Sequence, residues 1–522
     1  MSPRDLLRRR VRQALLISAV CAFDVTALSA TAGADTPLDH WGFTPISGSA
    51  LPCSATGDPA MASPMTLTKL MSAGDPATLV GPDTPTTVGR ENDMNALGAN
   101  GKYLFASSEN GAPSEGVSRY TLTGPTAGAK EILTTGPVAP ATTWSRMDGG
   151  YWYAPSGQLL VGEEYSPAAA ATANTQARGG GVWQVDPTTG AFVRLDWLGS
   201  MAHEGLVLSG GALFFGDENR TGAFYKAVPA NAADLTAGGT LNYMVGTGID
   251  ASGWKAVVTA DNAVAEANNG GAILFDRPED VDALGGRVYF TVTEAQGDAD
   301  LRIGNYGTFT GNAANNQVVN RGGIYSFNDT GVSDLSAQSG TNPPYVTIDP
   351  MIEVEDPEYA SQALAQGQQG LQYPDNIAFD GRGHLWVHED IPDDTAMTPT
   401  NIHSKQYRNQ QDEMYVFELT ASGDAIVGQP TDSGGVKAGD MQSSDATKPC
   451  TNEFTGGVFG ADGLSLFFNQ QHNANPTFRT SLSAVLPADV PEVSMPFLLT
   501  LSAGAILLGS VLWSRRVARA RA

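Results

Sequence analysis

The sequence repeats one phrase six times: a short apolar strand, a Gly-containing turn, a second strand of aromatic and β-branched residues, and then a polar cluster. Each turn has the chemistry of a β-hairpin, as in Ser209-Gly210-Gly211 and Asp462-Gly463. A phrase that recurs along a chain predicts repeated small sheets, and six such sheets predict an all-β, six-bladed β-propeller. The second strands of the six units are expected at residues 103–105, 159–161, 213–215, 288–290, 385–387 and 466–468.

A third strand is expected after the second in five of the units, at residues 116–120, 181–185, 222–226, 323–327 and 414–417. We find no third strand in the sixth unit, so we expect an N-terminal strand to complete the last blade. Cys53 and Cys450 lie near the two ends of the repeated body. They could form a disulfide across this closure in an oxidising compartment, and two unpaired thiols are an equal alternative.

The two ends of the chain predict export and a membrane anchor. Residues 1–34 combine a basic start, an apolar stretch and a small-residue cleavage site, as in a signal peptide of the ordinary secretory or the twin-arginine route. After the propeller (residues 35–472) we expect a linker (473–495), a transmembrane helix or removable sorting signal (496–513) and a basic cytoplasmic tail (514–522). The propeller is therefore expected outside the cytoplasm, either held at the bacterial membrane by the C-terminal helix or secreted if that signal is cleaved.

The charge of the chain excludes one class of partner. The sequence has 55 acidic and 30 basic residues, and nine of its Arg residues lie in the two terminal segments 1–34 and 514–522. Nucleic-acid binders need clustered Lys and Arg to displace counterions from the phosphate backbone. We therefore exclude nucleic acid as a partner of this acidic body, which we expect to be monomeric.

The polar clusters of the six units are expected to share one rim of the propeller. In a hairpin, the start of the first strand lies beside the end of the second. The polar residues before the first strands are Asn92-Asp93, Asp148, His203-Glu204, Glu279-Asp280, Asp375-Asn376 and Glu453. Those after the second strands are Ser108-Glu109-Asn110, Glu163-Glu164, Asp217-Glu218-Asn219, Glu294, His388-Glu389-Asp390 and Gln470-Gln471-His472. Closing the ring directs both sets to one central funnel.

So many carboxylates around one funnel predict bound cations. Close carboxylates in a partly dry site repel one another by several kcal/mol per pair, at the order of magnitude that Coulomb's law gives, unless cations neutralise them. Oxygen ligands favour Ca²⁺ first, with Mg²⁺ or Mn²⁺ as alternatives. His203, His388 and His472 keep one transition-metal position conceivable. Alternatively, each acidic residue is an ordinary solvated loop residue.

Several phrases, in this order along the chain, resemble the PhoX-type alkaline phosphatases, which are bacterial extracellular propeller enzymes. They are the segments 144–165, 201–205, 276–280, 373–380 and 467–472, and the resemblance runs from about residue 43 to residue 472. It implies a six-bladed propeller with a calcium and iron cluster in its funnel that hydrolyses phosphomonoesters. The metal ligands that it implies are Glu163, Glu164, Glu204, Glu279, Asp375, Asn376 and Glu453.

We assign catalytic roles to Glu204, Glu279 and Arg277, and further site roles to Asp148, Arg146, Asp217, Glu389 and His472. Arg146 and Arg277 could clamp phosphate oxygens, or form structural ion pairs with Asp148 and Glu279. The expected reaction is the attack of a metal-activated water or hydroxide on a small phosphorylated substrate. Family members often have a Cys iron ligand directly before the paired glutamates. This chain has Gly162 there, which counts against iron and against activity.

Two other functions remain open at this point. The propeller could be a catalytically inactive, calcium-stabilised surface module that binds a carbohydrate or a protein, because a fold does not fix a function. It could also be another metal-dependent hydrolase, such as a lactonase.

Overall fold

The computed structural model describes the chain in segments and separates it into two units. The fold below is that of the unit Phe43–Ala484; the other unit is Met1–Gly42 with Val485–Ala522. The predicted signal peptide, membrane helix and cytoplasmic tail lie outside the described residues, as do Cys53, Glu294 and Cys450. The described residues are 41–47, 51, 55–80, 92–98, 100–109, 116–134, 144, 146–164, 180–247, 250–293, 317–319, 323–328, 349–353, 374–390, 412–419, 436–442, 452–472 and 476–482.

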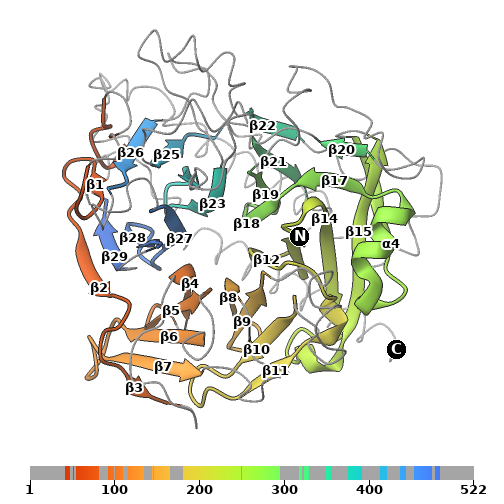
Figure 1. The fold of residues 1–522 in the computed structure, drawn as a ribbon, viewed down its shortest axis with the longest axis horizontal. Coiled ribbons are helices and arrows are strands. Elements are labelled where there is room, and N and C mark those ends of the chain that lie inside the picture. The colour runs from red at the N-terminus through yellow and green to blue at the C-terminus, as the bar shows by residue number, and fades with distance from the viewer. Residues whose placement is uncertain are drawn as a thin grey trace, which may run out of the picture. The chain divides into compact units, whose positions relative to one another are not determined.

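Six sheets, each an antiparallel meander at its centre, surround one axis of this unit (Figure 1). The strands nearest the middle are β4, β8, β12, β18, β23 and β27, and these inner strands of neighbouring sheets contact one another. Blades one and two are formed by β4 (Asn92–Gly98), β5 (Tyr103–Ser108), β6 (Gly116–Thr121) and β7 (Lys130–Thr134), and by β8 (Met147–Tyr153), β9 (Gln158–Glu163), β10 (Val182–Val185) and β11 (Phe192–Arg194). The predicted six-bladed propeller is confirmed.

Blades three and four follow the same order, and blade three is extended at its outer edge. Its main strands are β12 (Leu206–Ser209), β13 (Ala212–Gly216), β14 (Arg220–Pro229), β15 (Gly239–Thr247) and β16 (Asp250–Ala256). The long β14 also pairs with β17 (Ile273–Asp276), and β17 pairs in parallel with β20 (Gln317–Val319). Blade four is formed by β18 (Pro278–Leu284), β19 (Arg287–Val292), β21 (Gly323–Asn328) and β22 (Asp349–Glu353).

Blade six contains a third strand that the sequence analysis did not find. This strand, β29 (Thr477–Ser481), pairs with β28 (Ser465–Gln470) and lies within the segment predicted as a linker. The inner strand is β27 (Phe454–Phe459). Blade five is formed by β23 (Pro374–Phe379), β24 (Leu385–Glu389), β25 (Glu413–Phe417) and β26 (Val436–Asp440).

The N-terminal part of the unit adds an edge strand to three consecutive blades. The strand β1 (Ala60–Met61) pairs with β26 of blade five, and β2 (Thr68–Met71) pairs with β29 of blade six. Further along, β3 (Thr78–Leu79) pairs in parallel with β7 of blade one. The prediction that an N-terminal strand completes the last blade is confirmed, because β2 is the outer strand of blade six.

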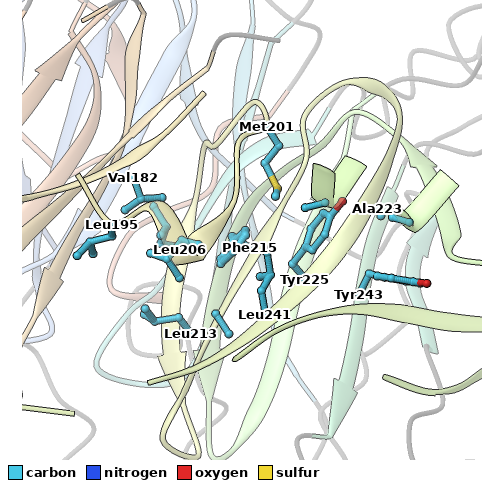
Figure 2. Packing of buried hydrophobic residues seen from close by; sticks show 14 of the residues in the cluster. Val182, Leu195, Met201, Leu206, Leu213, Phe215, Ala223, Tyr225, Leu241 and Tyr243 are labelled. Carbon is cyan, nitrogen blue, oxygen red and sulfur yellow. The ribbon is translucent and has the colours of Figure 1, made fainter. Parts of the chain in front are cut away.

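The core consists of apolar layers between neighbouring blades. Side chains alternate between the two faces of a strand, and a strand between two packed faces is apolar throughout. In β13, Leu213 and Phe215 pack in the same buried cluster as Val182 of blade two (Figure 2), whereas Phe214 packs with Phe290 of blade four. This two-sided burial explains why the second strands are the most apolar part of the repeated phrase.

The described helices are short. They are α4 (Ala263–Gly270) and the single-turn 3₁₀ helices η1 (Asp196–Leu198), η2 (Leu235–Ala237) and η3 (Ala260–Asn262). Within the described part of the chain, no helix has the length and apolar character needed to cross a membrane.

Candidate metal centre

Four inner strands carry a β-bulge at the same place, and an acidic residue stands first in each bulge. In blade one, for example, Asn92 pairs with Ser108 and Asn95 with Ala106, so two residues face Ser107 alone. A bulge bends the strand locally and redirects its side chains. The four bulges are Asp93-Met94, Asp148-Gly149, Glu279-Asp280 and Asp375-Asn376.

These bulged acids meet the acids at the ends of the second strands in four groups of carboxylates. Within each group, one oxygen from each residue lies within 4.8 Å of the others. The groups, which we call clusters 1 to 4, are Asp93-Glu109-Asp148, Asp148-Glu164-Glu218, Glu204-Glu218-Glu279 and Asp375-Asp390-Glu453. All six blades contribute, and the shared Asp148 and Glu218 join clusters 1, 2 and 3 into one continuous series.

Several oxygens of these clusters are buried without a hydrogen-bond donor. In the described part of the chain, no donor reaches Asp93 Oδ1, Asp148 Oδ1, Glu204 Oε2, Glu218 Oε2 or Glu279 Oε2. A buried carboxylate oxygen is costly unless a donor or a cation compensates it. These carboxylate oxygens are therefore suited to bind cations.

The electrostatics of the clusters point the same way. Burial, followed by repulsion from Glu279 and Asp375, holds the pKa of Glu204 well above its usual range. Burial likewise raises the pKa values of Asp93, Asp148, Glu164, Glu279, Asp375 and Glu453. Glu109 differs: burial opposes ionisation, but hydrogen bonds with Asp93 and Gln471 and the charge of Arg146 lower its pKa. The clusters thus need protons or cations to be stable.

Two arginines compensate part of this charge. Arg146 Nη2 lies 3.1 Å from Glu109 Oε2 and 2.8 Å from Glu164 Oε2. Arg277 contacts Glu218 Oε1 at 2.7 Å through Nη2 and Glu279 Oε1 at 2.9 Å through Nε. The expected pair of Arg277 with Glu279 is present, whereas the ion pairs of Arg146 are with Glu109 and Glu164 instead of Asp148.

Comparison with known proteins identifies the family of this propeller. A family model described as "Alkaline phosphatase PhoX" matches residues 143–474, well over half of the chain. The chain belongs to the PhoX alkaline phosphatase family. Members of the PhoX family are phosphoric monoester hydrolases. No curated protein matches the sequence.

Solved structures are similar to the chain at low sequence identity. PhoX from Pseudomonas fluorescens, in complex with the transition state analogue vanadate, is 17% identical with a TM-score of 0.53 and covers 84% of this chain and 99% of its own. The PQQ domain of pyranose dehydrogenase from Coprinopsis cinerea is 10% identical with a TM-score of 0.41 and covers 81% and 97%.

Most of the ligands that the PhoX resemblance implied lie at the clusters. Glu164, Glu204, Glu279, Asp375 and Glu453 are cluster members, as is Asp148. Asn376 lies beside them, with Nδ2 3.3 Å from Glu204 Oε1, and His472 Nε2 lies 3.0 Å from Glu453 Oε1.

Three of the expected site residues turn away from the clusters. Glu163 Oε2 accepts hydrogen bonds from Gly181 N at 3.1 Å and Trp183 Nε1 at 3.0 Å. The carboxylates of Asp217 and Glu389 also accept from main-chain N–H groups, those of Ala202 at 3.2 Å and Glu413 at 2.9 Å. Successive residues of a strand face opposite sides, so their neighbours Glu164, Glu218 and Asp390 face the clusters instead.

Four cluster members were missed as site residues: Asp93, Glu109, Glu218 and Asp390. They lie in the polar rim that the sequence predicted, but their direction follows from strand register. In three hairpins, the last residue of the second strand pairs with the residue just before the bulge of the inner strand. The next residues along the chain are Glu109, Glu164 and Asp390. Aligning the six hairpins by their last paired residue would have selected these acids.

The residues present do not fit the thiolate iron ligand of the PhoX resemblance. The described clusters contain only carboxylates. A Cβ atom added at Gly162 would lie 2.7 Å from the carbonyl oxygen of His203, so the backbone of blade three fills the place of a side chain. His203 and His388 are buried away from the clusters, against Phe215 and Phe454, and burial lowers the pKa of each to about 3. A transition-metal position with these two histidines, which the sequence left open, is absent from the described clusters.

Proposed function

We propose that this protein is an exported, metal-dependent phosphomonoesterase whose reaction takes place in the funnel of the propeller. One observation carries the proposal: ten carboxylates from all six blades of a PhoX-family chain converge in four clusters, and several of their buried oxygens have no donor within the described residues. Neither a solvated surface nor an apolar binding face accounts for that arrangement.

The clusters favour Ca²⁺ as the resident ion. Clusters of carboxylate oxygens match a hard cation that accepts six to eight oxygen ligands, and Asn376 offers an amide beside them. Glu204, Glu218 and Glu279 of cluster 3 would hold one ion, and Asp375, Asp390 and Glu453 of cluster 4 another. When bound, such a cation neutralises the carboxylates and supplies Lewis-acid activation of water and phosphate oxygens.

The arginines supply the positive charge that a phosphate dianion needs for binding. Arg277 lies between clusters 3 and 4, with Nη1 3.9 Å from Asp390 Oδ2, and its side chain is 24% exposed. Arg146 lies beside clusters 1 and 2 with a side chain that is 51% exposed. With the carboxylates neutralised, both guanidinium groups can turn N–H donors toward phosphate oxygens and orient the substrate.

Export and anchoring complete the proposal. The signal sequence at 1–34 and the apolar segment 496–513 with its basic flank support a propeller that works outside the cytoplasm. Localisation of the full-length protein by protease accessibility on intact cells tests this part independently of activity.

The activity is tested by hydrolysis of p-nitrophenyl phosphate by the purified propeller, with added Ca²⁺ and with chelator. We expect calcium-dependent release of nitrophenol, and bound calcium detectable by elemental mass spectrometry. Glu164→Gln should lower kcat/KM at least tenfold, whereas its neighbour Glu163→Gln should retain activity because Glu163 faces Gly181 and Trp183. Inactivity with every metal, together with hydrolysis of a lactone or binding of a carbohydrate, would overturn the proposal.

A further inference from the structure

Two buried hydroxyl groups link the bulges of neighbouring blades. Ser107 of β5 donates from Oγ to the carbonyl oxygens of Met94, at 3.1 Å, and of Asp148 in blade two. Thr291 of β19 contacts the carbonyl oxygens of Asp280, at 3.3 Å, and of Asp375 in blade five, at 2.6 Å. Both side chains are buried.

Ser107 and Thr291 occupy the same structural position. Each is the single residue that faces a bulge in the inner strand of its own blade. Each reaches the first bulged residue of the next blade, which is a cluster acid: Asp148 for Ser107 and Asp375 for Thr291. The same arrangement at two separate blade junctions, with different residues on both sides, indicates a shared requirement.

That requirement follows from the chemistry of a bulge. The extra residue of a bulge is left out of the hydrogen-bond ladder, so its main-chain groups need other partners when they are buried. A hydroxyl that holds the carbonyl of a bulged acid also fixes the rotation of that peptide, and with it the direction of the side chain. The hydroxyl groups of Ser107 and Thr291 therefore lie beside the metal clusters, but they contact carbonyl oxygens and not the carboxylates.

At other junctions between blades, different groups contact the main chain at the bulge. At the junction of blades six and one, Asn469 Nδ2 donates to the carbonyl oxygen of Asp93, and Thr455 Oγ1 contacts the same oxygen at 3.4 Å. Between blades two and three, Gly162 faces the bulge, and the backbones approach directly, with His203 N donating to Glu163 O at 2.9 Å. Ser107 and Thr291 differ from Asn469 and Thr455 in that each one faces the bulge of its own blade.

We propose that Ser107 and Thr291 are positioning residues of the metal centre, which hold the backbone of Asp148 and Asp375 so that both carboxylates point into the clusters. This inference rests on the proposed function in one respect only, that the clusters bind cations. Partners of this kind in other metal sites typically change metal affinity by about 10- to 100-fold when they are removed.

The test compares the cation affinity of full-length Ser107→Ala and Thr291→Val protein with that of the unmodified full-length protein, by calorimetric titration of Ca²⁺ and by Tb³⁺ luminescence. We expect at least tenfold weaker cation binding in both variants. In Ser107→Thr and Thr291→Ser, which keep the hydroxyl, we expect an affinity close to that of the unmodified protein. Thr480→Val is the matched control, because Thr480 is buried and its hydroxyl has no partner among the described residues. Thr480→Val should leave the affinity unchanged.

The outcomes separate this inference from the proposed function. Affinity within twofold of the unmodified protein in both variants overturns the positioning role even if phosphatase activity is present. Weakened binding with hydroxyl rescue, in a protein that hydrolyses no phosphomonoester, supports the positioning role and overturns the phosphatase. A propeller that binds neither ion overturns both. If a variant does not fold, Ser107→Cys and Thr291→Cys, with weaker donors of similar size, should give a smaller loss in the same direction.

Discussion

Arg146 and Arg277 occupy the same position in blades two and four, directly before the first paired residue of the inner strand. Both have a left-handed backbone, with φ of 52° and 57°, which few residues other than glycine adopt. Such a conformation costs about 1–3 kcal/mol and persists where the surroundings impose it, often at functional sites. The repeated strain places one guanidinium among carboxylates of neighbouring blades at each position.

Replacing Arg277 should destabilise the protein most when no metal is present. Arg277→Met leaves Glu218 and Glu279 buried without their cation, which should cost about 3–5 kcal/mol in chelator. Bound Ca²⁺ should reduce this cost, because it compensates the same carboxylates. Urea unfolding with chelator and with Ca²⁺ measures both values. Arg146→Met, at a side chain that is half exposed, should cost less, and an equal loss for Arg277→Met in both buffers would contradict the prediction.

Removal of metal should lower the thermal stability of the propeller. A ligand that binds only the folded state at 100 times its dissociation constant adds about 2.7 kcal/mol. With four clusters of buried and half-buried acids, we expect chelator to lower the Tm by several degrees and added Ca²⁺ to restore it. Differential scanning calorimetry measures this change, with Na⁺ at equal ionic strength as the control. An unchanged Tm, in protein that held no ion before treatment, would refute the metal centre.

Any side chain at Gly162 should strain the junction between blades two and three. Gly162→Ala brings a Cβ atom to 2.7 Å from His203 O and should cost about 1–3 kcal/mol. Gly162→Cys should be at least as unfavourable and should not gain iron, as elemental analysis can check. Gly150→Ala is a milder substitution in the same blade, because its Cβ would come no closer than 3.4 Å to Met94. Stable Gly162→Cys protein with stoichiometric iron would overturn this expectation.

Lys437 should matter for stability and not for metal binding. Its Nζ lies 2.6 Å from Glu413 Oε1 and 2.9 Å from Asp440 Oδ1, and all three side chains are buried. Lys437→Met should therefore cost about 3–5 kcal/mol. The exposed pair of Lys69 with Asp58, at 3.3 Å, is the control, and Lys69→Met should change stability by less than about 1 kcal/mol. Calcium affinity measured on the folded fraction should not change in either variant.

Asp282 should make the protein less stable as the pH rises. Burial raises the pKa of Asp282 from 3.8 to about 6, so the folded state holds a proton that the unfolded state has released. Stability from this group is therefore lost as the pH rises from about 4 to about 6. In Asp282→Asn this part of the pH dependence should disappear. The lost hydrogen bond from Phe379 N adds an offset at every pH, so the difference in slope between the two proteins is the measurement.

Strand periodicity was sufficient to find the blades. The second strands, such as β13 and β28, are apolar on both faces, and their sequences stand out for that reason. The third strand of blade six was harder to find, because the outer neighbour of β29 is only the short β2 and because its exposed Arg479 and Ser481 alternate with buried residues. Its sequence resembles a polar linker as much as a strand.

The sequence by itself determined that six hairpins bring a rim of acids to one funnel, because hairpin geometry places their ends together. Which acid of each pair enters a cluster was decided by the tertiary structure. Successive residues at the end of a strand face opposite sides, so Glu164 and Asp390 face the clusters while Glu163 and Glu389 bind the backbone. The contacts that hold the bulges, Ser107 with Asp148 and Thr291 with Asp375, join different blades. No local pattern encodes such pairs, because they form only when the ring closes.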